Sequence, residues 1–191
     1  MPMTKQQLRG RLILLSISAL FLIPIVAAAW LYFGPSDWRP AIHTERGQLV
    51  TPPVELPDTA FESSAGPFRF REVWTLIVFA DERCDATCVK TLENIRQIRL
   101  SLGPKIPRLQ TVFLPRNPAA ADSLDSVAFP KLYIAEPAAA DLVNERLGHW
   151  DNGQIFLVDP LGNLMMSYAP GASMGDVRAD LGHLLKLSGI G

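Results

Sequence analysis

The chain has 191 residues, about the length of one domain, and 48% of them are hydrophobic while 19% are charged. This composition excludes an intrinsically disordered chain. Lys and Arg total 18 and Asp and Glu total 19, so the net charge is -1 and no basic field exists to bind nucleic-acid phosphates. The two cysteines are four positions apart, which excludes a disulfide-stapled miniprotein.

An uncharged apolar segment covers residues 12–33. A helix of that length reaches roughly 33 Å, enough to cross a bilayer core of about 30 Å. Three basic side chains lie within residues 1–11, which predicts a cytoplasmic N-terminus, a single inner-membrane anchor and a periplasmic remainder in a bacterium. A cleaved signal peptide is the alternative, because the alanines at 27–29 resemble a small-residue cleavage site.

Residues 34–65 are rich in proline and predict an extended arm, and residues 66–191 predict one folded domain. The predicted elements, in chain order, are a short strand or hairpin near 67–70, strand 74–79, a helix from the cysteines to 102, strand 109–114, a loop at 115–125, a short strand within 129–135, helix 137–147, the strand pair 155–158 and 164–168, and a last helix with a capping box at Ser173 and Asp176.

Two of these elements carry the fold prediction. The run at 74–79 is continuously β-branched and aromatic, which indicates a strand buried on both faces. Apolar residues then recur at helical spacing from Cys88 to Leu102, forming one stripe. Alternating strands and helices are typical of an α/β layer arrangement. With a cysteine pair opening the first helix, we expect a thioredoxin-like domain, a central mixed sheet flanked by helices.

The pair Cys84 and Cys88 follows a buried strand, and a spacing of four places both sulfurs on one helix face. The positive end of a helix favours the thiolate, which is the reactive form in disulfide exchange and the ligand for soft metals. Nearby carboxylates at Asp81, Glu82 and Asp85 raise a thiol pKa, so we expect the helix to lower the pKa of these thiols only moderately. A purely structural disulfide is the alternative, although a loop of about five residues yields only roughly 2 kcal/mol.

The stretch at 74–79, Cys84-x-x-x-Cys88 and Thr91-Leu92 resembles the active site of the Sco/SenC family, membrane-anchored thioredoxin-fold proteins of cytochrome c oxidase assembly. Asp159-Pro160-x-Gly162 after a buried strand is similar to that family's late hairpin. The family has a proline directly after its second cysteine, and this chain has Val89.

The resemblance implies that copper, as Cu(I), is bound by Cys84, Cys88 and one histidine, and that the cysteines also cycle through a disulfide. Asp151 holds the place of the family's histidine, and His149 lies two residues earlier. His149 is therefore the candidate third ligand, and an exposed loop histidine is the equally weighted alternative.

Three functions follow from these features. The first is a Sco-like assembly factor that binds or transfers Cu(I) to a partner in respiratory oxidase assembly. The second is a thiol–disulfide oxidoreductase acting on cysteines of a respiratory-complex partner. Thioredoxins carry a proline before their third core strand, where this chain has Gly153 and Gln154, so a third possibility is a non-catalytic scaffold. No motif for a small-molecule substrate is evident.

Overall fold

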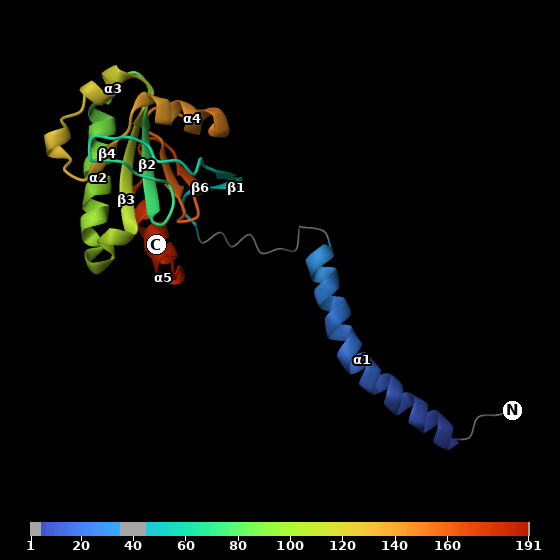
Figure 1. Ribbon diagram of the computed structural model, residues 1–191. Helices are drawn as coiled ribbons and strands as arrows, with labels where there is room; N and C mark the ends of the chain where they lie inside the picture. Colours follow the sequence, from blue (N-terminus) through green and yellow to red (C-terminus); the bar gives the residue numbers. More distant parts are fainter. Residues whose placement is uncertain (1–4, 35–44, 191) are drawn as a thin grey trace. The chain divides into compact units, whose positions relative to one another are not determined.

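The computed structural model describes residues 5–34 and 45–190 (Figure 1). Its elements are α1 (Lys5–Phe33), β1 (Gln48–Glu55), β2 (Trp74–Ala80), α2 (Ala86–Ser101), η2 (Gly103–Arg108), β3 (Leu109–Pro115), α3 (Pro118–Asp122), η3 (Ser126–Ala128), β4 (Leu132–Ile134), α4 (Pro137–Leu147), β5 (Ile155–Val158), β6 (Asn163–Tyr168) and α5 (Met174–Leu187). The chain divides into two units, residues 1–43 and 44–191. Of the predicted arm, residues 35–44 lie outside the described part of the chain.

Helix α1 forms where the apolar segment predicts a helix. From Arg9 to Phe33 it is long and apolar enough to cross a membrane, with a mean hydropathy of 2.7 and no buried side chains. A signal sequence near the N-terminus has the same properties, so α1 is a candidate membrane span.

The second unit is built on one six-stranded sheet with the strand order β1-β6-β5-β2-β3-β4. Strands β2, β3 and β4 are parallel, whereas β5 is antiparallel to β2, and β6 is antiparallel to both β5 and β1. Side chains of α2 and α5 share one buried cluster with the sheet, and side chains of α4 belong to a second cluster. The predicted mixed sheet flanked by helices is confirmed.

Strand β2 is buried on both faces, as its composition predicts. Leu76 and Val78 belong to the cluster shared with α2 and α5, and Ile77 and Phe79 belong to the cluster shared with α4. All four are at most 1% exposed. Because each such side chain contributes roughly 1.5–3 kcal/mol on burial, β2 anchors both halves of the core and fixes the direction of the loop that follows it.

Strand β1 falls within the predicted proline-rich arm. It contains Pro52 and Pro53 and pairs with β6 at the edge of the sheet, where a missing backbone donor is tolerated. The register shifts between Leu49 and Val54, so the prolines lie in an irregular stretch with paired residues on either side. The arm thus contributes a strand to the sheet.

A buried carboxylate on α5 holds the beginning of β1. Asp180 is 6% exposed and accepts hydrogen bonds from the backbone N–H groups of Arg46 at 3.0 Å and Gly47 at 2.9 Å. It also accepts one from the Tyr168 hydroxyl at 3.0 Å. Burial, assisted by the neighbouring Asp180 charge, raises the pKa of Tyr168, so its hydroxyl remains a donor.

The other departures from prediction are local. Ser173 does precede α5, but its side chain makes no capping hydrogen bond. The Asp176 carboxylate, which would complete a capping box at the Ser173 N–H, pairs instead with the guanidinium of Arg46 at 2.8 Å. That hydrogen bond and the Asp176 charge raise the pKa of Arg46. The segment near 67–70 forms a single antiparallel bridge between Phe61 and Phe68, and the predicted loop at 115–125 contains the short helix α3.

Candidate functional site

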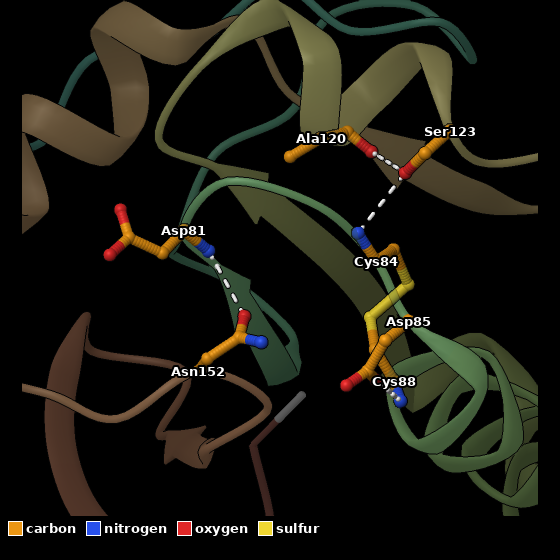
Figure 2. Close-up of a disulfide and its surroundings, with 7 residues drawn as sticks. All are labelled: Asp81, Cys84, Asp85, Cys88, Ala120, Ser123 and Asn152. Atoms are coloured by element: carbon orange, nitrogen blue, oxygen red, sulfur yellow. Dashed lines mark hydrogen bonds between the residues drawn. A yellow bond between two sulfur atoms is a disulfide. The ribbon is translucent and has the colours of Figure 1, made fainter.

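The predicted cysteine pair is joined as a disulfide at the start of α2. The sulfurs are 2.04 Å apart and the Cα atoms of Cys84 and Cys88 are 5.2 Å apart (Figure 2). Asp85 is the N-cap of α2, and its side chain accepts a hydrogen bond from the backbone N–H of Cys88 at 2.9 Å. A capping side chain of this type fixes the first turn of the helix, which carries one of the two sulfurs.

A second contact ties the cysteine loop to the segment after β3. The backbone N–H of Cys84 donates to the Ser123 hydroxyl at 3.1 Å, and that hydroxyl donates to the Ala120 carbonyl at 2.8 Å (Figure 2). Asn117 is the N-cap of α3 and donates its side-chain N–H to the Asp81 carbonyl at 2.9 Å. The helix α3, which the sequence did not predict, therefore holds both ends of the loop between β2 and α2.

The segment before β5 lies on the other side of this loop. Asn152 accepts a hydrogen bond from the Asp81 N–H at 3.1 Å (Figure 2). The backbone N–H of Gly153 donates to the Phe79 carbonyl at 2.9 Å. Gly153 has a φ of 79°, a conformation that favours glycine. Where thioredoxins have a proline, this chain presents a glycine turn bonded to the end of β2.

Both cysteines are largely buried, Cys84 being 6% exposed and Cys88 1% exposed. Both belong to the apolar cluster shared with α2 and α5. Of the two residues, Cys84 is therefore the slightly more exposed.

The charges around the pair are partly compensated. Asp81 forms an ion pair with Arg116 at 3.2 Å, and the guanidinium of Arg116 lies 4.4 Å from the ring centre of Trp150. The Trp150 ring in turn packs on Phe79, with ring centres 4.3 Å apart. Because Arg116 offsets one of the carboxylates that the sequence places beside Cys84, the local negative charge is smaller than the sequence alone implies.

The structure does not bring His149 together with the cysteines. Its side chain is 93% exposed, and its Nε2 atom is 3.8 Å from a carboxylate oxygen of Asp151. Over residues 5–34 and 45–190, no three His, Cys, Asp or Glu side chains converge as a metal site would require. The role of His149 as a third ligand stays a prediction.

Sequence reasoning missed three residues that surround the pair, namely Ser123, Arg116 and Asn152. Each reaches the cysteine loop from a distant segment. The Asn152-Gly153 dipeptide is a recognisable turn signal, but nothing local indicates that it bonds to the end of β2 and to Asp81.

Solved structures similar to this domain include three informative ones. Apo Sco1 from Thermus thermophilus matches with a TM-score of 0.60 and 24% identity, covering 75% of this chain and 99% of that one. Copper-bound ScoI from Arabidopsis thaliana matches with a TM-score of 0.56 and 12% identity, covering 71% and 99%. The thioredoxin domain of a Bacteroides vulgatus thiol-disulfide oxidoreductase matches with a TM-score of 0.52 and 15% identity, covering 68% and 94%.

These likenesses confirm the thioredoxin-like fold, which the two Sco structures share. A search of curated protein sequences finds no match to this chain. A family model described as the transmembrane-like, thioredoxin-like C-terminal domain matches residues 74–188, from the first residue of β2 to the residue after α5. The chain therefore belongs to the family of transmembrane-like, thioredoxin-like C-terminal domains.

Proposed function

We propose that this chain is a membrane-anchored, Sco-like assembly factor for cytochrome c oxidase that binds or transfers Cu(I) through Cys84 and Cys88. The observation that carries the proposal is the cysteine pair bridged at the beginning of α2, on the fold that copper-bound ScoI also has. Reduction of the bridge by an external dithiol adds two electrons and two protons. Loss of the two thiol protons then leaves two thiolates that hold one Cu(I) as cargo.

The surroundings of the pair suit thiolates better than the sequence alone suggests. The partial positive charge at the start of α2 stabilises negative sulfur, and Arg116 offsets Asp81. Soft thiolates favour Cu(I) over harder ions. In this proposal His149 completes the site when its loop approaches the cysteines, and its only ion-pair partner among the described residues is the exposed Asp151.

Copper retention tests this proposal. The full chain, purified in a non-ionic detergent and reduced, is loaded with Cu(I) without oxygen and dialysed against a moderate Cu(I) chelator. We expect about one copper per chain, lost in Cys84→Ser and in Cys88→Ser. His149→Ala should lower retention, whereas His183→Ala, a change at an exposed helix histidine, is the matched control. Failure of the reduced wild-type chain to retain copper would overturn the copper role.

A thiol–disulfide oxidoreductase acting on a respiratory partner is the second candidate. The bridged pair favours it, as does the lack of a gathered third ligand in the described residues. The Cys84 thiolate, from the more exposed cysteine, would attack a partner disulfide, forming a mixed disulfide and releasing one partner thiolate. The Cys88 thiolate would then attack the Cys84 sulfur, releasing the second partner thiolate and restoring the bridge.

Trapping separates the two candidates. With Cys88→Ser the mixed disulfide cannot resolve, so we expect a covalent adduct with a disulfide-bonded peptide on a non-reducing gel. Cys84→Ser serves as the control and should give much less adduct. Equal adduct from both variants would contradict the assigned order of attack. If a chain lacking both cysteines still supports oxidase activity in cells, the scaffold role accounts for the function and both chemical roles are wrong.

The location forms part of the same proposal. The basic residues before the apolar part of α1 favour a cytoplasmic N-terminus and a periplasmic domain, anchored in a bacterial inner membrane. Protease added to intact spheroplasts should then digest the domain while leaving α1 in the membrane. Protection of the domain until the membrane is opened would reverse the orientation.

A further inference from the structure

A small apolar cavity lies between α2 and the strands β3 and β4, apart from the disulfide. Its volume is about 130 Å³, and its lining includes the buried side chains Leu92, Ile95, Phe129 and Leu132. We call it the α2–β4 pocket. Leu92 is one helical turn after Cys88, so the pocket begins about 6 Å further along α2.

The size of the pocket limits what it can hold. Small-molecule sites typically enclose about 300–1,000 Å³, which is more than this pocket provides. A cavity of about 150 Å³ lined by Leu, Ile and Phe binds a molecule the size of benzene. The α2–β4 pocket therefore suits one aromatic or branched aliphatic side chain belonging to a larger molecule.

Three cations line the same pocket, namely Arg96, Arg99 and Lys131. No carboxylate is among the lining residues. Within the part of the chain that the structure describes, Arg96 and Lys131 have no ion-pair partner, and Arg99 donates its Nε–H to the Leu109 carbonyl at 3.1 Å. Residues 44–191 carry 18 acidic and 14 basic side chains, so a hollow lined by cations and no carboxylate stands out from the rest of the domain. Such a hollow is complementary to an apolar group flanked by carboxylates.

We propose that the α2–β4 pocket is a docking site for an acidic segment of a partner protein, anchored by one apolar side chain. The anchor fills the hollow beside Leu92 and Phe129, and flanking carboxylates meet Arg96 and Lys131. Such an arrangement matches interfaces in which one buried anchor supplies the affinity and charges at the rim set specificity. The docking surface needs neither copper nor disulfide exchange, so it stands apart from the proposed function.

The binding of three labelled peptides to the full chain in non-ionic detergent, measured by fluorescence anisotropy, tests this proposal. The first has Phe flanked by Asp and Glu, the second replaces Phe by Ala, and the third replaces the acids by Lys. We expect saturable binding of the first peptide alone, weakening with salt as exposed ion pairs do. Equal binding of the first and third peptides would overturn the charge argument, and equal binding of the first and second would overturn the apolar anchor.

Two charge-matched variants locate the binding. Arg96→Glu with Lys131→Glu changes two exposed residues that line the pocket, and should weaken the first peptide by about tenfold. Lys90→Glu with Lys105→Glu makes the same change in net charge at exposed residues outside the lining, and should change binding by about twofold or less. Equal weakening by both pairs would show non-specific attraction and refute the site.

A second copy of the chain is the competing occupant. Sedimentation of the full chain should give the same mass for the wild type and for the Arg96→Glu, Lys131→Glu variant. A wild-type dimer that this variant dissociates would make the pocket a self-interface and overturn the proposal. Circular dichroism checks that both variants fold, and the comparison among the three peptides holds even where a variant does not.

Discussion

Replacement of Asp180 by Ala should destabilise the domain by about 3 kcal/mol. In the structure this buried carboxylate accepts hydrogen bonds from the N–H groups of Arg46 and Gly47 and from the Tyr168 hydroxyl. Hydrogen bonds to charged groups contribute about 1.5–3 kcal/mol each. The two amides are only partly buried and can take water instead, whereas the hydroxyl loses its partner in the interior. The expected loss is therefore well below the sum of three bonds.

Urea unfolding of the full chain in detergent, followed by circular dichroism, measures this loss as a lower midpoint at unchanged slope. Asp180→Asn keeps one acceptor oxygen and should lie between Asp180→Ala and the wild type. The control is Asp176→Ala on the same helix, which removes only an exposed ion pair and should barely move the midpoint. If the two alanine variants unfold at the same urea concentration, the buried network does not hold β1 and the reasoning is wrong.

Three further predictions concern the same unfolding measurement. Burial raises the pKa of Tyr168 above its usual value of about 10, so the unfolded chain loses this proton first and the stability of the fold decreases as pH rises above about 10. The urea midpoint of the wild type should therefore fall more steeply between about pH 9 and 11 than that of Tyr168→Phe. Parallel curves for the two proteins would contradict this. Reduction of the Cys84–Cys88 bridge should cost about 2 kcal/mol, because the closed loop is short; a loss of about twice that size would mean that the bridge supports the fold more widely. Asp85→Ala should cost about 1 kcal/mol and Asp85→Ser much less, since serine can also cap α2; equal losses would show that the cap is not what matters.

The sequence predicts the interior of the sheet well. β2 and β5 are runs of β-branched, aromatic and aliphatic residues, and β3 ends in a third such run at residues 112–114. Such a run is favourable only when both of its faces are buried. The helix α4 is equally clear, because Pro137 begins it and Gly148 ends it. In each of these elements the local pattern and the tertiary environment favour the same structure.

Strand β1 could not be predicted in the same way. Its two prolines are a local signal against a strand, and they are compensated by an edge position and by contacts with Asp180, more than 130 residues away. Ser173 is the opposite case, because the local sequence predicts a capping box that does not form. The Asp176 carboxylate forms an ion pair with Arg46. Long-range partners decide both cases.

The candidate site was also predictable only in part. Two cysteines after a buried strand can be read directly from the chain, whereas the groups that hold their loop come from two distant segments, one after β3 and one before β5. Ser123 supports Cys84, and Arg116 offsets Asp81. Only the folded chain gathers these groups, so sequence reasoning overestimated the negative charge around the sulfurs.

The position of the bridge has a consequence for recognition. It spans only five residues, and α2 beyond it packs through Leu92, Ile95 and Ile98, none of which depends on the sulfur bond. Oxidation and reduction should therefore leave the outline of the domain nearly the same. A companion protein that recognises this outline would bind both redox states alike, and could stay in place while electrons or an ion pass between the two molecules.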